Sequence, residues 1–513
     1  MNPSKMDNLW KKEKVQGNYV DLFASVKNPY FDIYLQSVKA QHTRKNNQKS
    51  TEWRSKGNEL FRQENWLEAA ICYIKSLCFA EVGTENVALA YSNRSACYFH
   101  MRLYNEVLMD IELAKNANLP DRLLPKLEQR KKESKLMSML ELKEEFQPRL
   151  SYKADRNIPC MANVVEIKYN EKFGRHLIAK SDIPVGKIVL VENDIPRIRD
   201  EPSVCHSCLR LCMNCMACPN CPDVVFCSVD CMNNDQIHKF ECGTFFPHLQ
   251  PQGRIYIKIL LLATTSFPDV DSLMQFVESA LLEQPETLPT SLNDPKSKYN
   301  FFLKLSTSAP YAQALTEAHK VYKIMMDLPK VSGLFDSARK KRFLMHLVMH
   351  HILVYNSNAF KLGDSQYVAT VSSLMNHSCA PNIISCALKN YVIGMTGRPI
   401  RKGEQLFNNY SLELCGKPSN ERKAELKSRW GFDCKCERCE PTRAPIDRKM
   451  TTSDPCYKYV VKNQQIVDVR NQTESAIIKK KCIEFLNKYG RSAWSPEIEL
   501  VFNVFADYFA NAL

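Results

Sequence analysis

The chain has 513 residues, of which 44% are hydrophobic and 25% charged, and its formal charge at pH 7 is +14. This composition is that of an ordinary globular protein with several domains, and it excludes a mainly disordered chain. The first residues, MNPSKMDNLWKKEK, contain no apolar run of the kind found in a signal peptide. The apolar run at residues 255–263 is representative of the chain, and it is far too short to span a bilayer. We therefore expect neither a signal peptide nor a membrane span.

The charge and the cysteine content suggest what the chain binds. An excess of Lys and Arg favours acidic partners, but these residues are spread along the chain and would equally serve solubility. No basic motif is interleaved with aromatic residues, so we expect no direct reading of DNA bases. The 21 cysteines, in a chain without a visible export signal, indicate metal ligation rather than disulfides.

The first 137 residues divide into a lead-in and a repetitive helical region. Residues 1–50 lack a clear apolar period, and we expect them to be helical or partly disordered. Residues 51–137 predict helical hairpins, since small and aromatic residues recur at nearly the tetratricopeptide period of about 34 residues. The matching positions are Gly57, Trp66, Ala69 and Tyr73 in the first hairpin and Ser95, Tyr104, Val107 and Ala114 in the second.

Polar residues in this helical region suggest a peptide-binding groove. They resemble the carboxylate clamp with which chaperone-binding repeats hold the terminal carboxylate of an acidic peptide. An ordinary solvated helix face is an equally good interpretation, because such faces are also rich in charged residues. The clamp candidates are Arg54, Asn58, Asn93, Lys126 and Arg130.

Short β-like runs begin near residue 160 and stop at a cysteine-rich stretch. Residues 205–242 contain seven thiols and one imidazole in four close pairs, spaced C-x2-C, C-x2-C, C-x3-C and H-x3-C. Eight such ligands complete two tetrahedral zinc ions without an open position for water, which predicts structural metal. Disulfides or free thiols are the alternative, and the extra pair Cys212 and Cys215 leaves the pairing open. The eight ligands are Cys205, Cys208, Cys218, Cys221, Cys227, Cys231, His238 and Cys242.

A helical insert is predicted over residues 243–355 by its apolar periodicity. One of its helices carries His346, His350 and His351. Three histidines suggest metal, but no thiol or carboxylate set joins them. We therefore expect packed or surface histidines.

Three motifs follow the insert. Residues 374–382 read LMNHSCAPN, residues 403–410 read GEQLFNNY, and residues 434–439 read CKCERC. A fourth zinc ligand for the three late cysteines is available from Cys379, although unrelated free thiols are the alternative. The candidate ligands of this third site are Cys379, Cys434, Cys436 and Cys439.

These motifs resemble those of two known families. The metal pairs at 205–242, with Phe226 directly before Cys227, resemble the MYND zinc finger. The series NHSC-x-PN, GE-x5-Y and C-x-C-x2-C resembles the SET domain. A SET domain split by a MYND finger and preceded by helical repeats is similar to the repeat-containing subgroup of the SET and MYND domain-containing protein-lysine methyltransferases. The resemblance covers roughly residues 50–440.

The resemblance implies an α+β multidomain protein. A β-rich SET domain is interrupted by a zinc finger and a helical insert, and is followed by a Cys-rich post-SET site and a short C-terminal helical segment. The expected boundaries are 51–137 for the repeats, 160–204 and 356–411 for the SET domain, 205–242 for the finger, 243–355 for the insert, 412–442 for the post-SET site and 443–513 for the last segment.

The family transfers a methyl group from S-adenosylmethionine to a protein lysine, on histone or non-histone substrates. The resemblance implies that Tyr410 is the catalytic tyrosine, which orients the amine and the methyl group. It also selects the metal pairing: Cys205, Cys208, Cys227 and Cys231 for one zinc ion and Cys218, Cys221, His238 and Cys242 for another, three ions in all. The implied cofactor-binding residues are Phe173, Gly174, Arg175, Asn358, Asn376, His377, Tyr410 and Phe432.

Two departures from the family pattern support a competing hypothesis. His176 replaces the second glycine of a G-x-G turn and is expected to narrow the cofactor pocket or to force another backbone route, and Asn408 replaces an apolar strand residue. The alternative is a weak or inactive adaptor or transcriptional co-regulator, which binds proline-rich peptides through the finger and chaperone tails through the repeats. The family implies a location in cytoplasm and nucleus.

Overall fold

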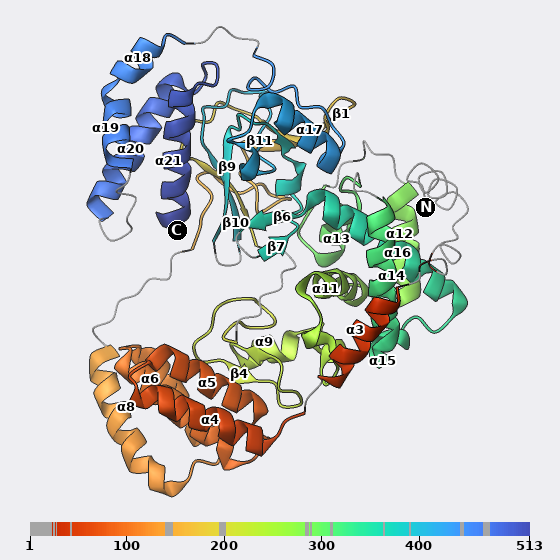
Figure 1. The fold of residues 1–513 in the computed structure, drawn as a ribbon, viewed down its shortest axis with the longest axis vertical. Helices are drawn as coiled ribbons and strands as arrows, with labels where there is room; N and C mark the ends of the chain where they lie inside the picture. Colours follow the sequence, from red (N-terminus) through yellow and green to blue (C-terminus); the bar gives the residue numbers. More distant parts are fainter. Residues whose placement is uncertain are drawn as a thin grey trace.

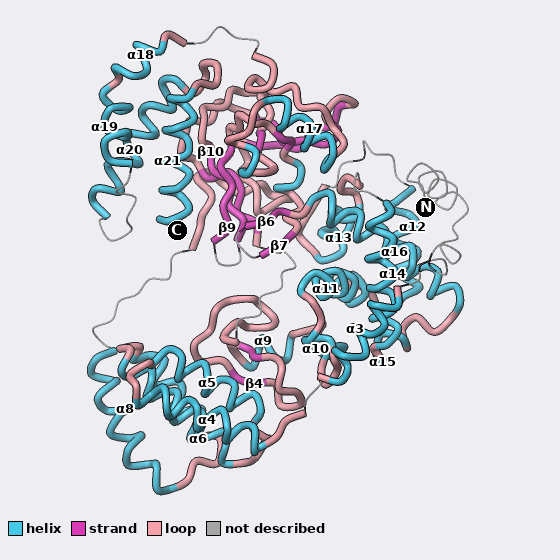
Figure 2. Tube along the Cα trace, in the orientation of Figure 1, coloured by secondary structure: helices cyan, strands magenta, loops and turns pink. Residues whose placement is uncertain are grey.

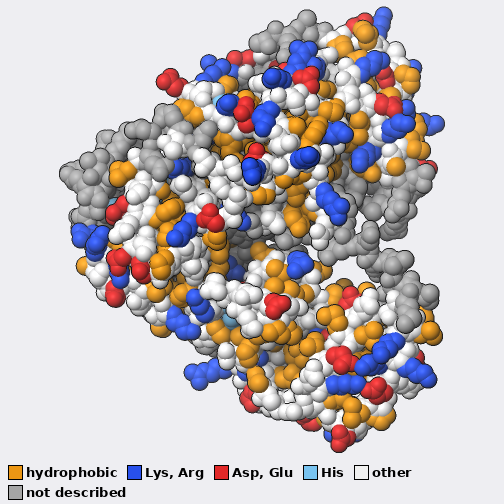
Figure 3. Space-filling model, turned by 180° about the vertical axis from the view of Figure 1, so that it is seen from behind, with side chains coloured by type: hydrophobic (Ala, Val, Ile, Leu, Met, Phe, Trp, Pro, Cys, Tyr) orange, Lys and Arg blue, Asp and Glu red, His pale blue; other side chains and the backbone are white. Residues whose placement is uncertain are grey.

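The computed structural model describes residues 23, 26, 28–41, 44–138, 147–193, 202–282, 287, 290–307, 311–362, 365–388, 391–441, 446–464 and 472–512. Helices dominate these residues and the strands form small sheets, so the expected mixture of α and β structure is confirmed (Figure 1). Most of the strands gather in one part of the molecule with helices on both sides, whereas β4 (Met216–Ala217) lies apart from them, near α9 (Val229–Asn234) (Figure 2). A space-filling view from behind shows a hollow between the upper and lower parts (Figure 3).

The described part of the lead-in is a helix that packs on the insert. Helix α3 (Pro29–Ala40) begins where Asn28 caps it, with Asn28 Oδ1 accepting from Phe31 N at 3.1 Å. Phe31, Leu35 and Val38 are buried in the same cluster as the insert helices. Figure 1 accordingly shows α3 beside α11 (Pro251–Thr265) and α14 (Tyr311–Asp327), away from the other N-terminal helices. Most of residues 1–27 lie outside the described residues.

Two helical hairpins and a further helix follow, where the repeats are expected. The first two of these helices approach each other closely at Gly57: a Cβ built there would lie 2.6 Å from Cε1 of Tyr73 in the second helix. The buried Tyr73, Ala69 and Val107 belong to the cluster that joins these helices. The elements are α4 (Asn47–Arg62), α5 (Trp66–Phe79), α6 (Glu85–His100), α7 (Tyr104–Lys115), η1 (Asp121–Leu123) and α8 (Leu124–Ser138).

The β region is assembled from two segments that are far apart in sequence. The central sheet has the antiparallel order β3–β10–β9, so that Ile393 of β10 pairs with Val191 of β3 and with Cys386 of β9. Bridges from Ile178 to Gln405 join the two segments again. The strands are β1 (Val165–Asn170), β2 (Gly174–Ala179), β3 (Ile188–Glu192), β6 (Phe360–Leu362), β7 (Ser365–Tyr367), β8 (Asn376–His377), β9 (Ile383–Leu388), β10 (Tyr391–Thr396) and β11 (Phe407–Asn408).

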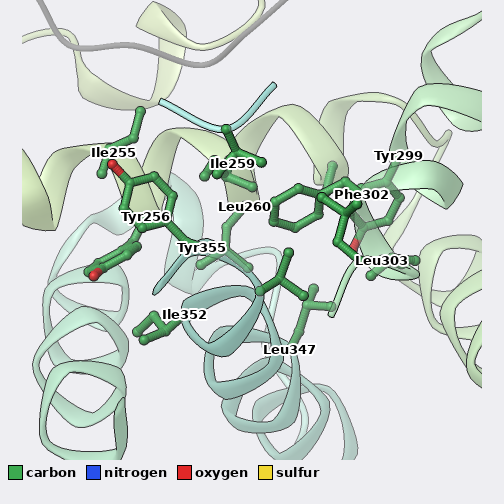
Figure 4. Packing of buried hydrophobic residues seen from close by; sticks show 14 of the residues in the cluster. Ile255, Tyr256, Ile259, Leu260, Tyr299, Phe302, Leu303, Leu347, Ile352 and Tyr355 are labelled. Atoms are coloured by element: carbon green, nitrogen blue, oxygen red, sulfur yellow. The ribbon is translucent and has the colours of Figure 1, made fainter. Parts of the chain in front are cut away.

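Between these segments the chain forms the cysteine-rich module and the insert. The module contains β4 (Met216–Ala217), β5 (Val225–Phe226), α9 (Val229–Asn234) and α10 (His238–Glu241). The insert contains η2 (Phe246–His248), α11 (Pro251–Thr265), α12 (Val270–Leu282), α13 (Pro295–Leu303), α14 (Tyr311–Asp327), α15 (Pro329–Ser332) and α16 (Ala338–Asn358). Ile259 and Leu260 of α11 and Leu347 of α16 point into one apolar core (Figure 4).

The insert histidines have packing partners rather than metal partners. His351 is fully buried, and its Nε2 lies 2.9 Å from the hydroxyl of Tyr299. His350 Nε2 lies 2.9 Å from the carbonyl oxygen of Leu303. Among the described residues, the groups able to hold a metal include neither of them nor His346. His351 is therefore a packed histidine, and His350 is half-buried against the carbonyl of Leu303.

The last helices cover one face of the central sheet. Ile384 and Met395 of the sheet share a core with Phe485 and Phe502 of α20 and α21. A Cβ at Gly397 would lie 2.3 Å from Cε2 of Phe502, so the contact is close. The elements are η3 (Ser372–Leu374), η4 (Leu412–Leu414), α17 (Ser419–Trp430), α18 (Arg448–Ser453), α19 (Pro455–Asn463), α20 (Gln472–Tyr489) and α21 (Pro496–Ala512).

No helix among the described residues is both long and apolar enough to cross a bilayer.

Candidate active site and metal centres

A cavity of about 1300 Å³ opens between the β region and the late cysteines. Its volume exceeds the roughly 300–1,000 Å³ of an ordinary ligand pocket, so that it has room for a cofactor and an inserted side chain. All eight residues implied as cofactor ligands line this one cavity: Phe173, Gly174, Arg175, Asn358, Asn376, His377, Tyr410 and Phe432. The structure thus brings together residues from five separate segments of the chain.

The tight turn between β1 and β2 forms one wall of the cavity. Gly174 has φ +62°, a conformation that favours glycine, and no atom lies within 4 Å of a Cβ built there. Asn170 fixes the turn, since its Oδ1 accepts from Phe173 N at 2.8 Å. The glycine therefore serves the backbone conformation and leaves open space beside the turn.

A parallel pair of two-residue strands, β8 and β11, forms the floor. Asn376 Nδ2 donates to Oε1 of Gln405 at 2.7 Å and to the carbonyl oxygen of Phe173 at 3.3 Å. Asn382 Oδ1 accepts from Phe407 N at 2.7 Å, which holds the two segments in register. Asn376 therefore joins the glycine turn to the strand that leads to Tyr410.

Tyr410 is anchored at both ends. Its backbone N donates to Nδ1 of His377 at 3.1 Å, and its hydroxyl donates to the carbonyl oxygen of Met375 at 3.1 Å. The ring stands edge-on to Phe432, with centroids 6.2 Å apart. Burial raises the pKa of Tyr410 well above its ordinary value, so the phenol stays protonated at neutral pH. It can orient a nucleophile by hydrogen bonding, but it is a poor base.

His377 and Asn358 are positioned by neighbouring backbone groups. Because His377 accepts at Nδ1, its proton lies on Nε2, which is 3.2 Å from Sγ of Cys379. Burial lowers the pKa of His377 to about 4, so the ring is neutral at pH 7. Asn358, at the end of α16, donates to the carbonyl oxygens of Ser306 and Val354 at 2.8 and 2.7 Å. Its side chain is therefore fixed in the wall.

The two departures from the family pattern are accommodated. The His176 ring turns back to its own turn, with Nδ1 2.8 Å from the carbonyl oxygen of Gly174, and His176 does not line the cavity. The expected narrowing of the pocket by His176 is therefore not observed. Asn408 is buried, but its Oδ1 accepts from Asn409 N at 2.8 Å. Neither residue obstructs the site.

Three groups of four ligand side chains have the geometry of zinc sites. Within each group the ligand atoms lie within 4.8 Å of one another. The groups are Cys205, Cys208, Cys227 and Cys231; Cys218, Cys221, His238 and Cys242; and Cys379, Cys434, Cys436 and Cys439.

Measured separations fit a tetrahedral ion. Four sulfurs bonded to zinc at about 2.3 Å stand about 3.8 Å apart. Sγ of Cys227 is 3.6 Å from that of Cys208, and Sγ of Cys379 is 3.6 Å from that of Cys439. Nε2 of His238 lies 3.6 Å from Sγ of Cys221. The donor sets therefore suit zinc, and the first two groups follow the pairing that the MYND resemblance selects.

A buried charged cluster around the second group was missed by the sequence analysis. His206 bonds to Asp235 through Nδ1 and to Glu241 through Nε2, both at 2.9 Å. Lys258 of α11 comes within 3.2 Å of the same Nε2. His206 thus links the cysteine-rich module to the insert. A lone histidine next to Cys205 carries no pattern that would have revealed this role.

The junction between the module and the N-terminal helices was also missed. Arg94 of α6 is 1% exposed and makes a bidentate ion pair with Asp110 of α7, at 2.7 and 2.8 Å. Nη1 of Arg94 donates to the carbonyl oxygen of Cys215 at 3.0 Å, and Asn214 donates to Asp110 at 2.7 Å. Cys212 and Cys215, the competing pair, pack against α5, and among the described residues they belong to none of the groups of three or more ligands that could hold a metal.

The clamp candidates lie on neighbouring helices, but several already have partners. Oδ1 of Asn58 accepts from Nδ2 of Asn93 at 3.0 Å and from the hydroxyl of Tyr73 at 2.8 Å. Arg130 donates to Oγ of Ser95 at 2.7 Å. Of the remaining two, Lys126 is exposed and Arg54 half-buried. The hydrogen bonds of Asn58, Asn93 and Arg130 therefore stabilise the packing of the helices, in addition to any role in peptide binding.

Comparisons with known proteins agree with this site. A sequence model of the SET domain family matches residues 258–411. A mouse protein named protein-lysine N-methyltransferase SMYD4 is 22% identical over 564 residues, covering 81% of this chain and 70% of the mouse protein. A SET and MYND domain-containing protein of Dictyostelium discoideum is 24% identical over 335 residues, covering 56% of this chain and 84% of that protein.

One solved structure is also similar, that of Rubisco LSMT bound to sinefungin and monomethyllysine. It is 11% identical, covers 68% of this chain and 85% of its own, and superposes with a TM-score of 0.28. A score this low says nothing about individual residues. The sequence matches are the stronger result: residues 258–411 match the SET domain family, and the chain is similar to proteins named as SET and MYND domain-containing or as protein-lysine methyltransferases.

Proposed function

We propose that the chain is an S-adenosylmethionine-dependent protein-lysine N-methyltransferase. One observation carries the proposal: a protonated, doubly anchored phenol, Tyr410, shares a cavity with Asn376, His377 and the Gly174 turn. The SET relatives named as protein-lysine methyltransferases support it. Histone and non-histone proteins are both candidate substrates.

The residues of the cavity fit the cofactor in chemistry as well as size. Phe432 and Trp430 offer aromatic faces for a flat base, and the guanidinium of Arg175 can meet a carboxylate. Polar side chains and carbonyls around Asn376 suit an amino-acid end. When bound, S-adenosylmethionine supplies a methyl group already activated by a sulfonium, so no metal or acid is needed for the transfer.

The chain's own contribution is alignment and desolvation. Fixing two reactants in line can be worth several kcal/mol of the activation barrier. The hydroxyl of Tyr410, held by the carbonyl of Met375, marks one edge of the reaction centre. A lysine amine that enters the cavity loses part of its water, which lowers the pKa of the amine and favours the neutral, nucleophilic form. The phenol orients that amine without accepting its proton.

Calorimetry with S-adenosylmethionine tests cofactor binding directly. We expect stoichiometric binding by the folded, zinc-loaded protein. Absence of binding would contradict the proposal and favour a non-catalytic adaptor.

The variant Tyr410→Phe tests the transfer step. We expect methylation of a responsive substrate, found by mass spectrometry of candidate proteins, to fall about 100-fold, because an oriented hydrogen bond at the reaction centre is lost. The affinity for S-adenosylmethionine should change less than about threefold. Tyr30→Phe is the matched control, since Tyr30 is 83% exposed on α3. Equal activity of Tyr410→Phe and the wild type would exclude this role.

Partner binding and location belong to the same proposal. The N-terminal helices would hold acidic chaperone tails through Lys126, Arg54 and the amide nitrogen Nδ2 of Asn58, and the finger would hold proline-rich peptides. Asn58→Ala should weaken the binding of an acidic C-terminal peptide, and unchanged affinity would argue against the clamp. We propose a location in cytoplasm and nucleus, which imaging of the tagged protein would test.

A further inference from the structure

The charged residues around the cavity are mostly cationic. Six Lys or Arg side chains line it, against three acidic ones. The cations are Lys172, Arg175, Arg398, Arg401, Lys435 and Arg491, and the acids are Glu404, Asp433 and Glu437.

The three acidic residues are already engaged. Glu437 pairs with Nη1 of Arg398 at 2.6 Å, in a partly buried contact. Asp433 pairs with Lys427 of α17 at 2.8 Å. A carboxylate oxygen of Glu404 accepts from the backbone N of Arg401 at 2.8 Å, which closes the turn. Two of the three acids therefore neutralise a specific cation, and the third stabilises the backbone.

Three exposed cations of the cavity lining form no ion pair among the described residues. Lys172 lies over the ring of Phe173, with Nζ 5.0 Å from the centroid, and forms no ion pair there. The side chains of Arg401 and Lys435 make no described ion pair either. These three come from the β1–β2 turn, the loop before Tyr410 and the third cysteine group, so they approach the mouth from different segments.

We propose that this rim selects target lysines within acidic segments, so the preferred substrate is a lysine flanked by Asp or Glu. The inference rests on the proposed methyltransferase function and names its substrate class. A lysine side chain reaches into the cavity on its four-carbon stem, while the residues on either side of it stay at the exposed mouth. There they meet Lys172, Arg401 and Lys435, and opposite charges favour encounter and register.

The same rim disfavours strongly basic segments. A substrate in which Lys and Arg surround the target would place like charges against unpaired cations, which costs affinity. Basic tails of the histone type should therefore be poor substrates compared with acidic protein segments. Because the rim is exposed, both effects should weaken as the ionic strength increases.

Peptide binding tests the preference without requiring catalysis. Three fluorescent peptides would share one central lysine in a Gly-Ser background, with two Glu, two Gln or two Arg residues on each side. Their affinities would be measured by fluorescence polarisation on the full chain loaded with S-adenosylhomocysteine at low and high salt. We expect the Glu peptide to bind at least about tenfold more tightly than the Arg peptide at low salt, with the difference shrinking at high salt.

Charge reversal at the rim gives the matched variants. Arg401→Glu and Lys435→Glu should each weaken binding of the Glu peptide by about three- to tenfold and strengthen that of the Arg peptide. Lys132→Glu makes the same change in net charge on exposed α8, outside the cavity lining, and should leave both affinities unchanged. S-adenosylmethionine binding, followed by calorimetry, should be retained by all three variants.

The outcomes separate the two proposals. Equal binding of the three peptides, or a preference for the Arg peptide, would overturn the acidic preference. An acidic preference in a protein that methylates none of the peptides would support the rim and count against the methyltransferase. Methylation of the three peptides with the same KM would support the methyltransferase and count against the selective rim. An equal effect of Lys132→Glu would show that only the net charge matters, which would also overturn the proposal.

Discussion

The molecule has two kinds of cysteine site, and they differ in how they are built. The first two groups lie within residues 205–242 and close a small local module. The third joins Cys379 to Cys434, 55 residues away, across the cavity wall. A group of metal ligands from one short stretch of chain can organise only that stretch, whereas a group that includes a distant ligand fixes the distance between two remote segments of the chain. The third site therefore belongs to the active site, and the first two belong to the module that packs on the N-terminal helices.

The largest expected effect comes from breaking the long-range group. Cys436→Ser should remove one zinc ion and weaken S-adenosylmethionine binding by about 100-fold or more, because metal binding supplies the energy that holds Phe432 near Tyr410. Zinc content by mass spectrometry and calorimetric affinity measure both consequences.

The local group supplies the control for that experiment. Cys227→Ser should also remove zinc, yet leave cofactor affinity within about threefold of the wild type. If both variants lost cofactor binding equally, the distinction between the two kinds of site would be wrong.

The second effect tests how the local module is attached. Arg94→Ala leaves Asp110 buried without its partner, which typically costs about 3–5 kcal/mol. Unfolding monitored by calorimetry should show an early transition of the N-terminal helices and the finger, while cofactor binding by the remaining structure persists. Lys131→Ala, which removes an exposed pair with Glu112, should change stability by less than about 1 kcal/mol.

A smaller effect is expected from Gly57→Val, within the N-terminal helices alone. The added side chain would collide with the ring of Tyr73, and overpacking of this kind costs about 1–3 kcal/mol. Gly253→Val in α11 is the control, since no atom lies within 4 Å of a Cβ there. Thermal unfolding of both variants would be compared, and equal losses would contradict the close contact at Gly57.

The smallest effect is expected from His176→Gly, which restores the family's glycine. Because the imidazole does not line the cavity, cofactor affinity should change less than about threefold. Glycine within a strand costs up to about 1 kcal/mol of stability. A large gain in affinity would mean that His176 does narrow the pocket, contrary to its position.

Local patterns in the sequence carried most of the correct predictions. Each pair of metal ligands lies within a few residues, so spacing alone reveals it, and the helical periods of 51–137 and 243–355 are local too. The placement of Asn376 beside the carbonyl of Phe173 was suggested only by resemblance, because the two residues are about 200 positions apart.

Contacts between remote segments were beyond reach from the sequence. Nothing in the neighbourhood of Arg94 indicates that its guanidinium bonds to Cys215, 121 residues later. His206 likewise looked like a spacer between two cysteines, yet it bonds to Asp235 and Glu241. The burial of His176 against its own turn depends on a side-chain rotamer, which a residue pattern does not specify.

The covering of β9 and β10 by α20 and α21 has a consequence for biosynthesis. Strands of the central sheet leave the ribosome long before Phe485, Phe502 and Phe505, which shield its apolar face. Until residues 472–512 have been translated, Ile384, Ile393 and Met395 face water or a chaperone. The central sheet is therefore expected to complete its folding only after residues 472–512 have been translated.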